Sequence, residues 1–327
     1  MWTLAHIQWA GIRAIAHTSL YIRTSSWMSP ATQPDRIKNY PCRPYLYGCR
    51  IFIPKDFQAT QEKKTLPLVI RAHGGGFIIN CPAADDILAR HLADNANCIV
   101  VSVDYSKAPQ NKFPTAYEDI IAQSLEIIDD PELPIDPSKV FLCGTSAGGN
   151  LLLGAAQDSR LRSKVFGVAA IYPVVDFEID SPTKMASRPD PTVPDFIGER
   201  WDSLLSLYLD ETHKASLSDV RLSPTRFATR ESLPPEILLI GAEHDMFCQE
   251  VEVMADKLAG EKPKIEIKDG WKVPGVQYYK AYGQPHAFDA FPAKDQEKEK
   301  ARVAAKDAMF DCITTWLKDT FSKAITR

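Results

Sequence analysis

Residues 139–156 read KVFLCGTSAGGNLLLGAA, and they place Ser146 where a strand pattern changes into a helix pattern. The run VFLC is short and apolar, as in a buried strand, and the run NLLLGAAQ is typical of a helix. Between them, Gly144 to Gly148 have the form G-x-S-x-G. In that context a sharp turn strains the serine and holds its hydroxyl up into a cleft. The five-residue pattern alone also fits a plain turn or a phosphate loop, so both alternatives stay open at this point.

Short β-branched runs alternate with helical patterns along the chain. Strands are predicted at residues 49–55, 66–72, 98–105, 139–144, 165–172, 236–242 and 276–282, and helices at 115–128, 248–260 and 296–323. Thr115 and Glu118 have the spacing of a capping box at the start of the first of these helices. The alternation predicts an α/β fold with a mainly parallel central sheet flanked by helices, in a single domain spanning residues 1–327.

Two segments do not fit the alternation. Residues 180–235 are rich in proline, serine and charge, with one helical patch at RWDSLLSLYL, and residues 1–45 precede the predicted strands. Ligand sites in open parallel sheets lie beyond the carboxyl ends of the strands. We therefore expect the two segments to form a helical cap over that edge of the sheet.

The composition is that of an ordinary globular protein. The chain of 327 residues is 45% hydrophobic and 24% charged, with a formal net charge of −4. No basic cluster stands out in the sequence, so nucleic acid is not an expected partner. No apolar run reaches the roughly 18 residues that crossing a bilayer requires, so no membrane span is predicted.

Cysteine usage and the N-terminal sequence bear on the compartment. The seven cysteines are an odd number, widely spread and without a CxxC pair, which fits a reducing compartment and predicts a cytoplasmic protein. The first acidic residue is Asp35, and Arg13 and Arg23 punctuate the apolar start, so a mitochondrial presequence is the alternative. We favour an amphipathic helix that covers part of the fold.

A glycine-rich loop follows the predicted strand at residues 66–72. It reads His73-Gly74-Gly75-Gly76-Phe77 and exposes successive backbone N–H groups. Such donors can stabilise the oxyanion of a tetrahedral intermediate, with a contribution of about 3 kcal/mol for each donor. A turn without function is the alternative, but HGGG directly after a strand is a specific signal for an oxyanion hole.

A general base and an acid are available further along the chain. Serine is a weak nucleophile at neutral pH and needs an imidazole to accept its proton, and a carboxylate must orient that imidazole. Asp245 and His286 each lie just beyond a predicted strand, and the order Ser, Asp, His is the one expected of an α/β-hydrolase. His244 is the alternative base and Glu243 the alternative acid.

Five motifs in order carry a resemblance to a known family: HGGGF, VDYSKAPQNKFPTAYED, GTSAGGNL, GAEHD and PHAF, between residues 66 and 288. The chain resembles the hormone-sensitive-lipase-like family of α/β-hydrolases, which has HGGG and G-[DT]-S-A-G-G motifs and includes many bacterial, fungal and plant carboxylesterases. The resemblance implies a catalytic triad of Ser146, Asp245 and His286. It also implies an oxyanion hole in the loop of His73 and Gly74, with the N–H groups of Gly75, Gly76 and Ala147 as donors.

The sequence departs from the family pattern at a few positions. Thr145 stands where aspartate is commoner, Ser106 and Lys107 replace the usual arginine and leucine, and Met246 stands where a proline often follows the acid. The segment KDGWKVPGVQ before the last predicted strand is longer than expected. The overall texture resembles fungal members found near secondary-metabolite pathways.

These observations favour a serine carboxylic-ester hydrolase that acts on a small-molecule ester or lactone, with no metal or organic cofactor. One alternative is a dehydratase, cyclase or acyltransferase that keeps the scaffold and redirects the intermediate. Another is a ligand-binding receptor on the same fold, although receptors that resemble this family have lost the catalytic histidine. An apolar edge strand near the C-terminus could support a homodimer, and the sequence leaves the natural substrate open.

Overall fold

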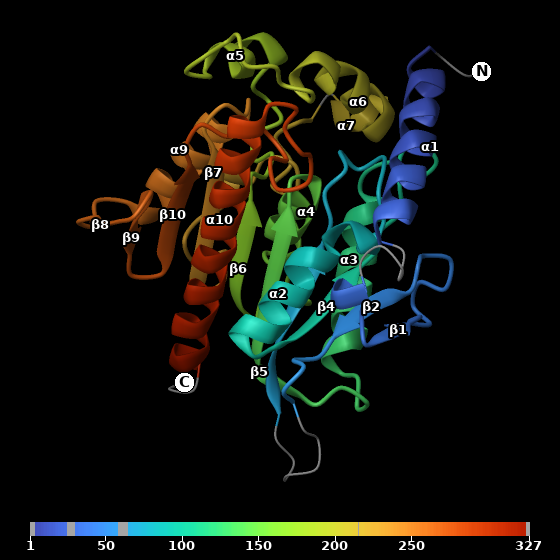
Figure 1. Cartoon of the computed structure of the whole chain (residues 1–327), viewed down its shortest axis with the longest axis vertical. Coiled ribbons are helices and arrows are strands. Elements are labelled where there is room, and N and C mark those ends of the chain that lie inside the picture. The colour runs from blue at the N-terminus through green and yellow to red at the C-terminus, as the bar shows by residue number, and fades with distance from the viewer. Residues whose placement is uncertain (1–3, 25–29, 58–64, 215, 325–327) are drawn as a thin grey trace.

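The computed structural model describes residues 4–24, 30–57, 65–214 and 216–324, and a twisted sheet lies at its centre (Figure 1). The sheet has ten strands in the described part of the chain, in the order β1-β2-β4-β3-β5-β6-β7-β10-β9-β8. The strands are β1 Arg36–Lys38, β2 Cys49–Phe52, β3 Leu66–Ala72, β4 Ile99–Val103, β5 Ile135–Thr145, β6 Val165–Ile171, β7 Glu236–Ala242, β8 Ile265–Ile267, β9 Gly270–Val273 and β10 Val276–Ala281.

The central strands are parallel, and this places their carboxyl ends at one edge. The pairs β4-β3, β3-β5, β5-β6, β6-β7 and β7-β10 are parallel, and the outer pairs are antiparallel. Ala72 at the end of β3 pairs with Gly144 near the end of β5, and Ala242 pairs with Ala281. Residues that follow these strands therefore meet above one edge of the sheet.

Helices cover both faces of the sheet (Figure 1). They are α2 Asp86–Ala96 and α10 Gln296–Lys323 on one face, and α3 Thr115–Ile128, α4 Ala147–Ala155 and α9 Cys248–Ala259 on the other. Side chains alternate along each strand, so Leu68 and Ile70 of β3 join one hydrophobic core and Val69 joins the other. The two buried faces explain why the central strands read as continuous apolar runs.

The N-terminal helix and most helices of residues 180–235 lie beyond the carboxyl ends of the strands (Figure 1). They are α1 Leu4–Thr24, α5 Ser181–Ala186, α6 Trp201–Tyr208 and α7 Glu211–Lys214, with a short helix η3 at Gly198–Arg200. The short helix α8 Pro224–Phe227 packs instead against α4 and α9. The two segments touch, because Trp9 Nε1 donates to Ser203 Oγ at 3.0 Å. Residues 1–3, 25–29 and 215 of the predicted cap lie outside the described residues. Their joint action as a cap stays a prediction.

No helix within the described ranges has both the length and the hydropathy that a membrane crossing requires.

The structure contains three strands that were not predicted from the sequence, β1, β8 and β9. β1 lies within residues 1–45, and β8 and β9 form a hairpin from the long segment before β10, where Gly270 pairs with Tyr279 and Ile267 with Gly270. The predicted capping box is wrong: α3 follows Pro114, no side chain caps it, and the carboxylate of Glu118 pairs with Arg160 at 2.9 Å. A guanidinium supplied by the neighbouring loop competes for that carboxylate, and the local spacing cannot reveal it.

Gly148 is a position where packing excludes any side chain. A Cβ at Gly148 would lie 2.1 Å from the carbonyl oxygen of Ala72, so α4 can approach β3 this closely only because glycine is present. We expect Gly148→Ala to lower the free energy of unfolding by about 2 kcal/mol or more, because backbone must move to relieve the clash. Chemical denaturation measures the change.

The matched control is Gly11→Ala in α1, where an added Cβ would meet nothing within 4 Å. Alanine has the better helix propensity, so this variant should be as stable as the wild type or slightly more stable. Equal unfolding midpoints for Gly148→Ala and Gly11→Ala would contradict the packing argument.

Candidate active site

Ser146 lies in a strained turn between β5 and α4. Its backbone has φ 53° and ψ −120°, which is in the region that side chains disfavour. An added Cβ at Gly144 would lie 2.4 Å from the carbonyl oxygen of Gly148, so the two glycines let the chain reverse this sharply. The turn presents the serine side chain at the carboxyl edge of the sheet.

The structure brings the predicted serine, histidine and aspartate into one chain of contacts. Ser146 Oγ lies 2.9 Å from His286 Nε2, and His286 Nδ1 lies 2.6 Å from Asp245 Oδ2. A carboxylate only accepts, so Nδ1 carries the hydrogen and donates to Asp245. Nε2 is then free to accept from the serine hydroxyl, which is the arrangement that a general base requires.

Neighbouring groups fix the orientation of both partners of the serine. Asp245 is 1% exposed, and its second oxygen Oδ1 accepts from the N–H of Phe247 at 3.0 Å. The rings of Tyr172 and Phe247 pack edge-on against the imidazole of His286, with centroids 4.9 and 5.5 Å away. The imidazole is therefore held in place by a carboxylate on one side and by aromatic rings on others.

Burial and charge act in opposite directions on His286. Burial alone would lower the pKa of the imidazole, but the charge of Asp245 and the hydrogen bond to it outweigh burial. The pKa of His286 is therefore raised above its ordinary value.

The two alternatives from the sequence have other partners. The carboxylate of Glu243 accepts from the N–H of Gly283 at 2.7 Å, and His244 Nε2 lies 4.0 Å from that carboxylate. The backbone N–H of His244 donates to the carbonyl of Gln284. Contacts with Ser146 and its base thus favour Asp245 and His286 over these neighbours.

The glycine loop is anchored through His73. Its Nδ1 lies 2.7 Å from the carbonyl oxygen of Gly74, its Nε2 lies 3.2 Å from Asp104 Oδ1, and its ring stacks on Tyr105. Burial alone would raise the pKa of Asp104, but the contacts with His73 and Lys107 outweigh it and lower the pKa to about 2. A charged, buried carboxylate therefore holds the start of the loop.

The loop offers backbone donors beside Ser146. An added Cβ at Gly74 would lie 3.3 Å from Ser146 Cβ, so the loop and the serine are in direct contact. Gly75 and Gly76 have φ values of 129° and 57°, and within the described residues no backbone acceptor pairs with their N–H groups. Ala147 is the first residue of α4, so its N–H has no partner within the helix.

The helix α6 lies directly over this loop. An added Cβ at Gly76 would lie 2.4 Å from Leu204 Cδ1, and the ring of Phe77 stacks on Tyr208 with centroids 3.9 Å apart. Ser146 is only 7% exposed beneath this cover.

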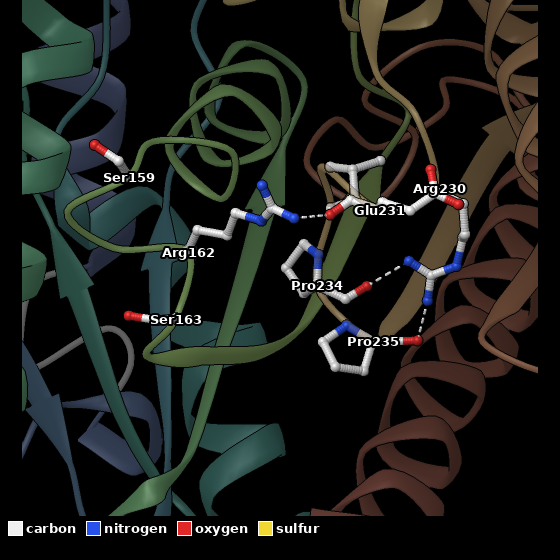
Figure 2. Close-up of a pocket in the computed structure, with 8 residues that line it drawn as sticks. Ser159, Arg162, Ser163, Arg230, Glu231, Pro234 and Pro235 are labelled. Carbon is white, nitrogen blue, oxygen red and sulfur yellow. Dashed lines mark hydrogen bonds between the residues drawn. The ribbon is translucent and has the colours of Figure 1, made fainter.

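A separate hollow of about 570 Å³ lies among the residues that precede β6 and β7 (Figure 2). It is lined by Ser159, Arg162, Ser163, Arg230, Glu231, Leu233, Pro234 and Pro235. Because these residues lead into the amino ends of parallel strands, the hollow is at the edge opposite Ser146. Arg162 donates to the backbone carbonyl of Glu231 and Arg230 donates to that of Pro234, so both guanidinium groups of the hollow are paired with the protein's own backbone (Figure 2).

The sequence reading missed two buried carboxylates near the site. Asp104 lies within the motif VDYSKAPQ, which marked the segment as part of the family resemblance. Its pairing with His73 depends on the fold and could not be predicted from that motif. Asp195 accepts from the N–H of Met246, next to Asp245. No motif marks Asp195, because it lies in the irregular segment between α5 and η3.

Comparisons with known proteins bear on the fold and the family of this chain. The sequence model of a family with the alpha/beta hydrolase fold matches residues 69–277. Probable carboxylesterase 5 of Arabidopsis thaliana is 31% identical over 48% of this chain and 53% of its own length. The arylesterase of Saccharolobus solfataricus is 30% identical over 70% of this chain and 71% of its own length.

Among solved structures, the esterase of Pyrobaculum calidifontis is 25% identical, with a TM-score of 0.73, over 98% of this chain and 95% of its own. The predicted fold class and the predicted family are both confirmed by these matches. The chain belongs to the hormone-sensitive-lipase-like family of α/β-hydrolases, a family of carboxylic ester hydrolases.

Proposed function

We propose that this carboxylic ester hydrolase cleaves small-molecule esters or lactones through an acyl-enzyme formed on Ser146. The contact chain from Ser146 Oγ through His286 to Asp245 carries the proposal. His286 accepts the proton of the hydroxyl as the serine oxygen attacks the ester carbonyl. The protonated imidazole then gives the proton to the leaving alcohol, and water releases the acyl group by the same steps.

The oxyanion of each tetrahedral intermediate would be held by the N–H groups of Gly75, Gly76 and Ala147. These donors lack backbone partners in the described part of the chain, and their loop touches Ser146 through Gly74. Each donor in such a site lowers the activation free energy by about 3 kcal/mol in studied cases. The loop would need no rearrangement, because His73 and Asp104 already anchor it.

The hydrolase reading is favoured over a binding role by His286, which hydrogen-bonds both neighbours that a catalytic histidine needs. Related proteins are named carboxylesterase and arylesterase, and we extend ester hydrolysis to this chain on that basis. A role in fungal secondary metabolism stays a prediction from the overall resemblance of the sequence to fungal members of the family.

Ser146→Ala removes the nucleophile and should abolish the hydrolysis of short p-nitrophenyl esters, while the fold stays intact. The control is Ser159→Ala, at an exposed serine in the hollow at the opposite edge, which should hydrolyse these esters at the wild-type rate. Release of p-nitrophenolate measures both. Near-normal turnover by purified, folded Ser146→Ala would contradict the assignment.

Asp245→Asn and Glu243→Gln separate the two candidate acids. An amide in place of Asp245 favours the wrong imidazole tautomer, so we expect kcat to fall by about four orders of magnitude. Glu243 contacts a backbone N–H away from His286, so Glu243→Gln should keep kcat within about threefold of the wild type. The reverse ranking would assign the acid to Glu243.

The pH profile reports the state of His286. Protonated imidazole cannot accept the serine proton, so activity is present above its pKa and is lost as the pH falls through it. Because the charge of Asp245 outweighs burial, we expect the acid limb of kcat/KM to have an apparent pKa above the ordinary value of about 6.5. A limb well below that value would contradict the electrostatic argument.

A further inference from the structure

Asp195 connects the segment above the sheet to the loop that carries the triad acid. It lies between α5 and η3 and is 3% exposed. Its Oδ1 accepts from the N–H groups of Ile197 and Gly198 at 2.9 and 3.0 Å, which closes a turn of its own segment. Its Oδ2 accepts from the N–H of Met246 at 2.9 Å. One carboxylate therefore fastens two segments far apart in the sequence, and we call its bond to Met246 the cap tether.

The cap tether acts on the residue next to Asp245. Oδ1 of Asp245 accepts a hydrogen bond from the N–H of Phe247, within the same loop. The N–H of the preceding residue, Met246, donates to Asp195 instead. The donor exists because residue 246 is methionine, since a proline at this position would have no N–H.

A second contact holds the same loop from the same side. Lys184 of α5 is buried, pairs with Glu250 of α9 and donates to the carbonyl oxygen of Asp176 at 2.6 Å. Its ammonium lies 4.8 Å from the ring centroid of Phe247, and that ring packs against His286. The segment above the sheet therefore contacts both residues that directly follow Asp245, Met246 through its N–H and Phe247 through its ring.

We propose that Asp195 is a positioning residue for ester hydrolysis, whose bond to the N–H of Met246 keeps Asp245 and His286 aligned with Ser146 while the segment above the sheet is docked. This inference rests on the proposed function, since it assigns no new chemistry to Asp195. The carboxylate acts through the acid loop and touches neither the serine nor a substrate.

The charge of Asp195 has a separate effect that a purely structural residue lacks. The charges of three carboxylates each raise the pKa of the His286 imidazole. Asp245 lies in the loop after β7, Asp195 lies in the segment above the sheet, and Asp289 follows the histidine. The rings of Tyr172 and Phe247 fill other sides of the imidazole. Removing the charge of Asp195 should therefore make the imidazolium less favourable and move the acid limb of kcat/KM to lower pH.

The first comparison is between Met246→Pro and Met246→Leu in the full chain. Proline removes the N–H that Asp195 accepts, and leucine keeps the N–H with nearly the same side-chain volume. On p-nitrophenyl acetate we expect Met246→Pro to have a kcat about tenfold lower than Met246→Leu, with KM changed by less than about threefold. The effect falls on kcat because the loss misaligns the base and leaves substrate binding alone.

The second comparison is between Asp195→Asn and Asp202→Asn. Asp202 is an exposed carboxylate on α6 and serves as the matched control, with kcat and the pH profile of the wild type expected. Asp195→Asn should lower kcat about tenfold and shift the acid limb downward. Combining Asp195→Asn with Met246→Pro should lower kcat no further than the more damaging single change. The one oxygen of asparagine is held by the N–H groups of Ile197 and Gly198, and its NH2 group cannot accept from residue 246, so both changes remove the same bond.

Wild-type kcat in folded Asp195→Asn would overturn the inference, as would a loss expressed only in KM. If Met246→Pro does not fold, the comparison of Asp195→Asn with Asp202→Asn decides alone. Ser146→Ala is measured in the same assay: retained turnover there contradicts the proposed function itself. Loss of turnover in Ser146→Ala together with wild-type kcat in Asp195→Asn contradicts only the role of Asp195.

Discussion

The turn at Ser146 is the constraint on which the rest of the site depends. A serine with φ 53° and ψ −120° stores strain, and it persists because Gly144 and Gly148 let β5 and α4 approach without side chains between them. The turn also gives Ala147 the first position of α4, where a backbone N–H is unpaired. One local geometry thereby presents a hydroxyl and a backbone donor at the same edge of the sheet.

Parallel pairing brings the other groups to that edge. The glycine loop follows β3, the acid loop follows β7, and His286 follows β10, so three strand ends surround the serine turn. Asp195 and Lys184 reach the acid loop from the segment over the sheet. The protonation of His286 thus depends on carboxylates from several elements, and its position depends on how these elements are docked.

Much of the fold was readable from the sequence, because buried parallel strands are continuous apolar runs and the motifs mark the ends of β3, β5, β7 and β10. Chain order, strand ends and the family resemblance together favoured Ser146 and His286 as partners, with His244 as the alternative base, and Ser146 Oγ lies 2.9 Å from His286 Nε2. The hairpin of β8 and β9 was missed because its short strands carry exposed residues such as Ile265. The role of Asp195 could not be predicted for a different reason. Asp195 lies in an irregular segment, its partner is the backbone N–H of a residue about fifty positions away, and every residue except proline has such an N–H, so no sequence pattern marks the pair.

Covalent labelling tests the central claim most directly. Diethyl p-nitrophenyl phosphate transfers its phosphoryl group to an activated serine and releases p-nitrophenolate, and peptide mass spectrometry locates the label. We expect one diethylphosphoryl group per chain, on the peptide that contains Ser146, with esterase activity lost in proportion to labelling. Complete labelling of Ser146 with activity retained, or loss of activity with the label on another residue, would contradict the account.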